Sequence, residues 1–567
     1  MVQSGYVHGV PDTEYWMAEV RRGIAFRRKY AKQAEWARWR TYYRGDWPRD
    51  ILPVNLYFRM LRTIVPRIYF RNPSISITNT RPGAEFEALA QIIERIDNKL
   101  IRTMRVKQSI KTIIQHAWMF GTGAGVIGLG SKTQLTLDEF GQNETQTLAK
   151  GKLIQRFDYA ETTEDNMPWF QPCHTGTLIV PAGLANFSTG RWFAQWVQKP
   201  LYEVQTDPRL SNTKDLKSSR NPEAFVMGQN AMDTPQDMVD LVIIRDKMFK
   251  KVFMIAPYST GSKVLYFSDD AMQINGRAGM YPLVFNEDDE VFWGVPDSQI
   301  LDPQQRELNE IRTLQAKHRR LAIVKLFMED NSIASEEIDK MTNEDVLAVV
   351  KAKNINGIKP MVLAQEPDSL RYAGREVMDD VRENLGFSRN QSGNYGEGSG
   401  GGASRASATE ASIVQAASEI RVDERRDMCA DLITNVFTDI NTMIFSAWGQ
   451  EQVVSILGPN GLPIWVAFKP QALKGVEYLM DIDPDSAAPQ THAVRSQSAI
   501  QTYSLFKDNP LIDPAKLTKN TLRELHGVEF DDMMRDLGVM RDGAGGNPSQ
   551  PLSMEQYLSN ATQNGAP

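Results

Sequence analysis

The sequence predicts an α+β protein, because long helical stretches lie on both sides of a block of short strands. Residues 84–120 carry apolar side chains at helical spacing. From about 121 to 290 the pattern changes to short apolar or alternating runs separated by Gly and Pro. A further helical pattern continues unbroken from 407 to about 448. Strands gathered in one block, with helices outside it, are typical of the α+β class.

The composition is that of a folded protein with several domains. The chain has 567 residues, 41% hydrophobic and 24% charged, with a net charge of -6. This length supports two to four domains, and the acidic balance gives no indication of a nucleic-acid-binding protein. Cys173 and Cys429 are the only cysteines, which indicates a reducing compartment without a disulfide framework or structural metal.

Targeting signals are not expected. The N-terminus lacks the apolar core of a signal peptide. No stretch approaches the roughly 18 uninterrupted apolar residues that a membrane-spanning helix needs. We therefore expect no membrane span and folding in a cytoplasm.

Residues 13–44 are expected to be helical and are unusually basic. From Arg21 to Arg49 there are ten Lys or Arg residues against Glu35 and Asp46. Aromatic residues are interleaved with this charge: Phe26, Tyr30, Trp36, Trp39, Tyr42, Tyr43 and Trp47. Such a mixture is compatible with a nucleic-acid face. It also fits a helix whose aromatics pack inward and whose arginines meet acidic neighbours, which is the commoner situation for a charge run.

The block after Phe120 opens with a stretch, 121–130, that imitates a nucleotide-binding motif. Gly123, Gly125 and Gly128 satisfy G-x-G-x-x-G, in which a strand comes before the glycines and a helix after them. Here a helix comes first and a strand follows. We therefore expect the glycines to close a helix and to let two backbones approach each other. An intracellular enzyme that binds a nucleotide at 121–130 is the alternative.

Six strands are expected within the block. They are Lys152–Tyr159, Thr177–Val180, Trp192–Val197, Leu241–Arg245, Val252–Ile255 and Val264–Phe267. Their apolar or alternating pattern and the turn residues between them carry this prediction.

The second half contains two helices of matched length. Asp302 and Pro303 are a strong helix start, as N-cap and first helical residue, and the helix runs to about Leu321. Pro367 opens a second helix that ends near Phe387. Between them we expect a strand at 323–328, a short helix at 335–341, a segment at 346–350 and a strand at 358–363. This pattern indicates a stalk of two helices with a small α/β tip.

A glycine-rich segment separates this stalk from a very long helix. Six of the eleven residues from 392 to 402 are glycine, so the segment has high backbone entropy. Ser407 and Glu410 then form a capping box. The helix that follows, to about Trp448, would be about 60 Å long.

Residues 481–486 imitate the start of a calcium-binding loop. The position of the loop's bidentate Glu holds His492, and Ser486 replaces the required glycine. The six histidines are scattered, and no hydrolase, zinc-protease or Cys/His nucleophile motif occurs. We therefore expect no metal, no cofactor and no enzyme activity.

Several short motifs follow one another along the chain in a recognisable order. They are Tyr42-Tyr43-Arg44-Gly45 with Asn55, the helix–glycine–strand junction from Ala117 to Gly125, Asp165-Asn166-Met167-Pro168-Trp169, and Gly294 to Gln299 before a helix. The two helices around a small insertion, the Ser/Thr-rich entry at 407–412 and Asp481 to Ser486 complete the series. In this order, over almost the whole chain, they resemble the portal proteins of tailed bacteriophages.

The resemblance implies a portal fold with an α/β wing, a two-helix stem, a small α/β clip, a long crossing helix and a helical crown. The implied segments are a wing at 1–300, stem helices at 301–321 and 366–388, a clip at 322–365, a tunnel loop at 389–406, the long helix at 407–449, wing return strands at 450–489, crown helices at 490–541 and a flexible tail at 542–567.

The resemblance also implies site residues. The DNA-facing residues of the tunnel loop would be Arg389, Tyr395, Glu397 and Arg405. Those of the stem, toward the channel, would be Arg312, Lys317, Arg319 and Arg320. The clip would contact partners or neighbouring subunits through Phe327, Met328, Glu336 and Glu337.

A portal function would make the chain a non-enzymatic subunit of a ring of twelve at the unique vertex of the virion capsid, assembled in the host cytoplasm. Double-stranded DNA would pass through the channel during packaging and ejection. The implied partners are the terminase large subunit, head-completion, adaptor or tail proteins, and the major capsid and scaffolding proteins. The second alternative, besides the nucleotide-binding enzyme, is a monomeric DNA-binding protein built on residues 21–49.

Overall fold

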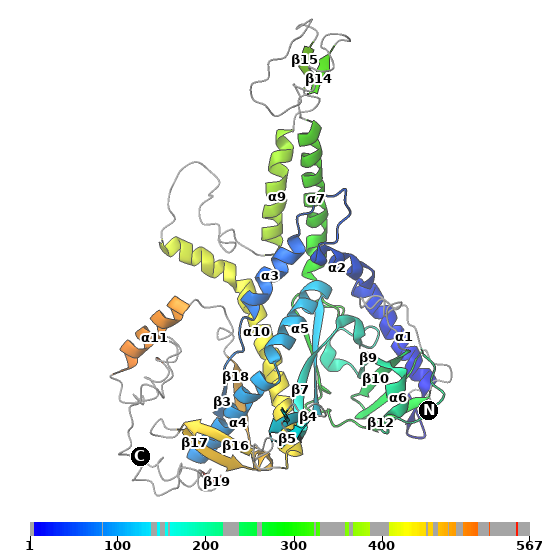
Figure 1. Cartoon of the computed structure of the whole chain (residues 1–567), viewed down its shortest axis with the longest axis vertical. Coiled ribbons are helices and arrows are strands. Elements are labelled where there is room, and N and C mark those ends of the chain that lie inside the picture. The colour runs from blue at the N-terminus through cyan, green and yellow to red at the C-terminus, as the bar shows by residue number, and fades with distance from the viewer. Residues whose placement is uncertain are drawn as a thin grey trace. The chain divides into compact units, whose positions relative to one another are not determined.

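The structure of the chain is a computed structural model, which mixes helices and strands and so confirms the α+β class (Figure 1). It describes residues 5–81, 83–137, 144–147, 153–156, 159–218, 237–257, 263–321, 325–328, 358–361, 367–385, 408–449, 452–457, 463–474, 476–482, 492–507, 521 and 552–553. The chain divides into two compact units. Unit 1 comprises Met1–Ala34, Thr63–Pro296 and Arg421–Pro567, and unit 2 comprises Glu35–Arg62 and Asp297–Ile420.

A five-stranded antiparallel sheet in unit 1 has the strand order β12-β11-β10-β9-β8. The strands are β8 (Leu178–Ile179), β9 (Trp192–Pro200), β10 (Met238–Asp246), β11 (Lys251–Ile255) and β12 (Val264–Asp269). Each coincides with an expected strand. Helix α1 (Thr13–Tyr30) covers the sheet, because Trp16, Val20 and Ile24 share a buried core with the sheet residues Trp192 and Phe253. Helix α6 (Leu201–Thr206) follows β9.

A second sheet in unit 1 has the order β13-β4-β7, with strands Met280–Val284, Thr122–Leu137 and Tyr159–Cys173. Helices α4 (Ala84–Thr103) and α5 (Val106–Phe120) precede it in the chain. The helical region predicted over 84–120 is therefore confirmed, as two helices rather than one continuous one. Arg105, with φ 53°, interrupts it in the left-handed region, and this conformation of a non-glycine residue leaves no mark in the hydrophobic periodicity.

Smaller elements complete unit 1. The two-stranded pairs are β1 (Tyr6–Val7) with β2 (Val10–Pro11), β5 (Glu144–Thr147) with β6 (Leu153–Arg156), and β3 (Ile75–Asn79) with β18 (Tyr478–Ile482). Strands β16 (Gln452–Leu457) and β17 (Pro463–Phe468) form a hairpin, and α11 (His492–Phe506) begins the segment expected to be a crown. Within the expected flexible tail, β19 (Leu552–Ser553) pairs in parallel with β17, so these two residues are strand.

The predicted long helix is confirmed as α10 (Ala408–Ala447), a single helix of 40 residues. In unit 1 a fully buried carboxylate, Asp439, holds it. Asp439 accepts hydrogen bonds from Arg277 Nε at 2.9 Å, Asn275 Nδ2 at 2.7 Å and the Tyr281 hydroxyl at 2.6 Å. Burial and this carboxylate raise the pKa of Tyr281, so the phenol stays a donor.

A second buried polar contact fastens α10 to α4. Asn441 Nδ2 donates to Asp97 Oδ2 at 3.0 Å and contacts the Tyr478 hydroxyl at 3.1 Å. Burial raises the pKa of Asp97 well above its ordinary value. Oδ1 of Asp97 and Oδ1 of Asn441 are both buried without a hydrogen-bond partner. A protonated Asp97 supplies a donor to this acceptor-rich contact, which agrees with the raised pKa.

Unit 2 is mainly helical. Its elements are α2 (Trp36–Arg44), the first half of α3 (Leu56–Ile68), α7 (Asp297–Leu321), β14 (Lys325–Met328), β15 (Ile358–Met361), α9 (Asp368–Leu385) and the start of α10, up to Ile420. The helix predicted over 13–44 is wrong between α1 and α2, where Lys32 takes φ 49° and Gln33–Glu35 form a 3₁₀ turn. Nothing in the sequence pattern separates 35–62 from the rest of the predicted wing.

The start predicted for the first stalk helix is also wrong. Helix α7 begins at Asp297, five residues before Asp302, and Pro303 lies inside it. Asp302 is buried and forms ion pairs with Arg38 and Arg306 at 2.8 and 3.0 Å. Its carboxylate therefore binds these two arginines and does not cap the start of the helix. Packing of the earlier turn outweighs the proline, because Leu301 is buried and the Tyr57 hydroxyl donates to the Ser298 carbonyl at 2.5 Å.

Candidate functional site

Helices α7 and α9 form an antiparallel hairpin in unit 2 (Figure 1). Gln315 Nε2 of α7 donates to the Leu370 carbonyl of α9 at 2.8 Å. Further along the hairpin, a Cβ added to Gly374 would lie 3.8 Å from Ile311 Cγ2. Residue numbers therefore rise on one helix as they fall on the other. The buried seam between them consists of Leu308, Ile311, Val377, Val381 and Leu385.

Another flank of α7 carries a ladder of polar side chains, Gln305, Asn309 and Thr313. Gln305 Oε1 accepts from the Leu56 N–H at 2.9 Å, and its Nε2 donates to the Val54 carbonyl at 2.7 Å. Asn309 Oδ1 accepts from the Val54 N–H at 2.9 Å, and Thr313 Oγ1 from the Leu52 N–H at 3.0 Å.

The three hydrogen-bonded pairs of this ladder are in register because the helix repeat and the extended-chain repeat are nearly equal. Rungs four residues apart on a helix are separated by about 6.0 Å, and alternate residues of an extended chain by about 6.6 Å. The segment 52–56 therefore runs antiparallel to α7 and presents alternate N–H groups to it. This contact was not predicted from the sequence. The pattern that could have indicated it is a row of uncharged hydrogen-bonding residues at i, i+4 and i+8 of α7.

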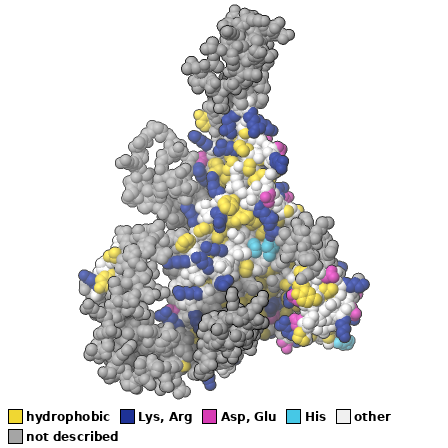
Figure 2. Space-filling view, viewed as in Figure 1, with side chains coloured by type: hydrophobic (Ala, Val, Ile, Leu, Met, Phe, Trp, Pro, Cys, Tyr) yellow, Lys and Arg dark blue, Asp and Glu magenta, His cyan; other side chains and the backbone are white. Residues whose placement is uncertain are grey.

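The hairpin is electrically divided along its length. Residues 311–321 of α7 and 368–375 of α9 contain six Lys or Arg and one Asp. Residues 297–310 and 376–385 contain two Arg and eight Asp or Glu. Figure 2 shows Lys and Arg side chains gathered at one end of the hairpin. The basic half can contact phosphates, and the acidic half repels them.

The four predicted stem residues, Arg312, Lys317, Arg319 and Arg320, are all exposed and lie in this basic half. Arg312 also donates to Gln315 Oε1 at 3.4 Å. For the clip, Phe327 and Met328 lie in β14, where they pair with Lys359 and Ile358 of β15. Glu336 and Glu337, and the tunnel-loop residues Arg389, Tyr395, Glu397 and Arg405, lie outside the described residues.

The basic segment 21–49 buries much of its aromatic surface. Phe26, Trp36 and Trp39 are buried. Arg27 is buried too and donates to the Leu178 carbonyl at 2.9 Å. Arg38 pairs with Glu35 at 2.6 Å as well as with Asp302. The interpretation of inward-packed aromatics is confirmed for Phe26, Trp36 and Trp39, and that of arginines beside acidic neighbours for Arg38.

The glycines at 121–130 serve packing. Helix α5 ends at Phe120, Gly121 closes it with φ 84°, and β4 follows, so the order is helix before strand, as expected. A Cβ on Gly123 would collide with the Ile113 carbonyl, and one on Gly128 would collide with the Trp169 ring. These glycines permit the close approach of α5 and β7 to β4.

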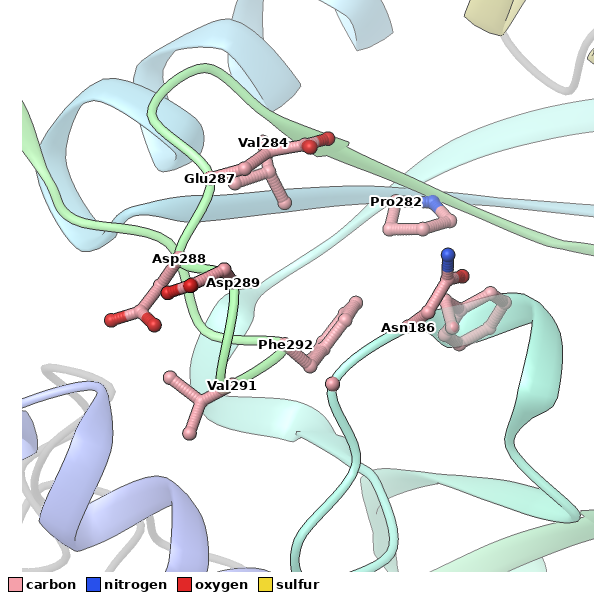
Figure 3. A pocket seen from close by; sticks show the side chains of 10 residues that line it. Asn186, Pro282, Val284, Glu287, Asp288, Asp289, Val291 and Phe292 are labelled. Carbon is pink, nitrogen blue, oxygen red and sulfur yellow. The ribbon is translucent and has the colours of Figure 1, made fainter.

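An open cavity of about 320 Å³ in unit 1 is the remaining candidate (Figure 3). Phe187 and Phe292, with ring centroids 5.7 Å apart, form part of its apolar side. Glu287, Asp288 and Asp289 give it an acidic rim. Its lining residues include no Cys, His, Ser or Lys, and the three carboxylates of the rim can attract a cation.

Two further observations concern only the described part of the chain. It contains no helix that is both long and apolar enough to span a membrane. It contains no group of three His, Cys, Asp or Glu side chains that could hold a metal ion. Of the calcium-loop imitation, Asp481 lies in β18 opposite Ser76, and Asp483 and Asp485 lie outside the described residues.

No protein-family model matches the sequence, and no curated protein matches it either. The hairpin, its charges and the order of the elements along the chain are therefore the features that bear on function.

Proposed function

We propose that the chain is a portal subunit of a tailed bacteriophage. Twelve copies form a ring at one capsid vertex, and double-stranded DNA passes through it. The observation that supports this is the order of elements in the second half of the chain. The antiparallel helices α7 and α9 have β14 and β15 between them, and the 40-residue helix α10 comes next. This order matches the stem, clip and long helix that the resemblance implies.

The hairpin is suited to form part of a channel wall. At 25 residues, α7 is about 37 Å long, and it is supported on one flank by α9 and on another by the ladder from segment 52–56. A duplex that slides needs weak contacts. The acidic half of the hairpin opposes tight binding, and the basic half offers a few phosphate contacts with little counterion release.

In this proposal the protein carries out no reaction. The terminase large subunit hydrolyses ATP, and the portal provides the ring on which that motor and later the adaptor or tail proteins dock. The clip, around β14 and β15, is the docking surface. Capsid and scaffolding proteins contact the ring inside the assembling head.

Assembly is the decisive test. The purified chain should form closed rings with a central hole in negative-stain images. Native mass spectrometry should give twelve times the subunit mass of 64.0 kDa. A clean monomer over a range of salt and protein concentrations would contradict the proposal. A monomer that binds nucleotide in calorimetry, or duplex with a steep salt dependence, would instead favour one of the two alternatives.

A further inference from the structure

Unit 2 has an exposed basic face built around an aromatic side chain. Phe58 of α3 is 46% exposed, and the Arg62 guanidinium lies 5.7 Å from its ring centroid. The Tyr43 ring of α2 lies 5.7 Å from the Phe58 ring, and Arg44 beside it is exposed. No acidic residue occurs from Ile51 to Ala84. We call Tyr43, Arg44, Phe58 and Arg62 the basic–aromatic face.

The same unit has an exposed acidic face on α9, also built around an aromatic side chain. Tyr372 is 65% exposed. The acidic residues Glu376, Asp379 and Glu383 share its side of the helix, because i+4, i+7 and i+11 return to nearly the same direction. Asp380, at i+8, lies about 80° around the helix from Tyr372, at the edge of this side. The buried residues Val377, Val381 and Leu385 point the other way, into the α7 seam. We call Tyr372 with these four acids the acidic–aromatic face.

The acidic–aromatic face is unfavourable in an isolated copy. Glu376 and Asp380, and likewise Asp379 and Glu383, are like charges at i, i+4, which destabilise a helix. They also lie in the second half of α9, toward its negative dipole end. Arg382 compensates in part through its ion pair with Asp379 at 2.7 Å. A cationic partner surface would relieve both repulsions.

The two faces are different surfaces of unit 2. Arg59 of α3 reaches Met378 Sδ of α9 at 3.6 Å, so α3 lies beside α9 on its Met378 side. Met378 is two positions from Glu376, about 200° around the helix. The acidic–aromatic face is therefore turned away from α3 and from the basic–aromatic face of its own copy.

We propose that these faces bind each other between copies, with the acidic–aromatic face of one copy on the basic–aromatic face of the next. Opposite charges surround an exposed aromatic anchor on each side, so the two faces are complementary in charge and each offers an aromatic side chain that the contact would bury. Since the two faces differ, the contact is head-to-tail and repeats until it closes into a ring. The closure rests on the proposed portal function, and the pairing of faces is the new element.

Charge reversal tests the pairing. One variant carries Glu376→Lys with Glu383→Lys, and the other carries Arg44→Glu with Arg62→Glu. Each alone brings like charges together, so the concentration needed for assembly should rise at least about tenfold over the parent. An equimolar mixture restores opposite charges at every contact. It should therefore form rings in which the two variants alternate, with even subunit numbers in native mass spectrometry.

The controls separate this inference from the portal proposal. Lys214→Glu with Lys250→Glu changes the net charge as much as the basic-face variant does but lies in unit 1, and should assemble like the parent. Circular dichroism and thermal unfolding establish that each variant is folded. If the parent forms rings and either reversed variant does too at parental concentration, or the folded pair does not recover on mixing, the pairing is overturned and the portal proposal stands. A monomeric parent overturns both.

Discussion

The part of helix α10 in unit 1 and helix α7 in unit 2 are both fastened by polar groups, but by opposite means. Helix α10 is held by one buried charge, Asp439, on which several donors converge. Helix α7 is held by three neutral side chains that each receive one backbone N–H. A charged centre concentrates stability in one residue, whereas a ladder distributes it.

The largest expected effect is at Asp439. Asp439→Ala leaves Arg277, Asn275 and the Tyr281 hydroxyl without their acceptor, and losing one partner of a buried ion pair costs about 3–5 kcal/mol. Tyr281→Phe removes one neutral donor and should cost about 1 kcal/mol. Urea unfolding at fixed protein concentration measures both. If both variants lose the same unfolding free energy, the charge of Asp439 contributes no more to stability than a single neutral hydrogen bond.

The ladder on α7 should give smaller and graded losses. Gln305→Leu removes two hydrogen bonds, the one accepted from the buried Leu56 N–H and the one donated to the Val54 carbonyl, and should cost about 1–3 kcal/mol. Asn309→Leu should cost less. It removes the acceptor of the Val54 N–H, but Gln305 still donates to the Val54 carbonyl and holds that residue on the helix. Thr313→Val should cost least, about 0.5 kcal/mol, because the Leu52 N–H is exposed and water can replace Thr313. Urea unfolding measures the loss of global stability in each variant. Limited proteolysis near residue 52 measures how far the segment 52–56 has detached from α7. Equal losses of unfolding free energy in the three variants would contradict this graded ladder.

The prediction for Asp97 is a dependence of stability on pH rather than a fixed loss. The pKa of Asp97 is raised by burial, so between about pH 4 and its native pKa the folded state holds a proton that the unfolded state has released. Stability from this group is complete below about pH 4 and is lost as the pH rises through the native pKa. Asp97→Asn should remove this decline and match the parent at low pH. Thermal unfolding from pH 4 to 8 measures it, and parallel profiles would contradict a protonated Asp97.

Much of the fold follows from periodicity. Helices α7, α9 and α10 and strands β8 to β12 coincide with expected segments, apart from the start of α7, because runs of apolar residues at helical or strand spacing mark each of them. The breaks at Lys32 and Arg105 do not follow, since a non-glycine residue at positive φ leaves no pattern. Helix α3 was not predicted, because proline normally ends a helix and Pro66 lies inside this one.

The candidate site was predictable only in part. Two helices around a small insertion can be recognised from Pro367 and the matched lengths. The Gln305–Asn309–Thr313 ladder could not be assigned a partner, because its acceptors receive backbone N–H groups, which any sequence provides. The acidic–aromatic face follows from helical spacing once the buried side of α9 is known. The basic–aromatic face does not, since it joins Tyr43 and Phe58 from different helices.

The ladder also has a mechanical consequence. Its three rungs run across the helix, from Leu52, Val54 and Leu56 to successive turns of α7. A force along the hairpin axis therefore loads all three bonds together in shear, and none can slip without the others. A force that lifts the segment at Leu52 peels the bonds one at a time. The segment 52–56 is thus a strut that is stiff along the hairpin and easily opened from its exposed end.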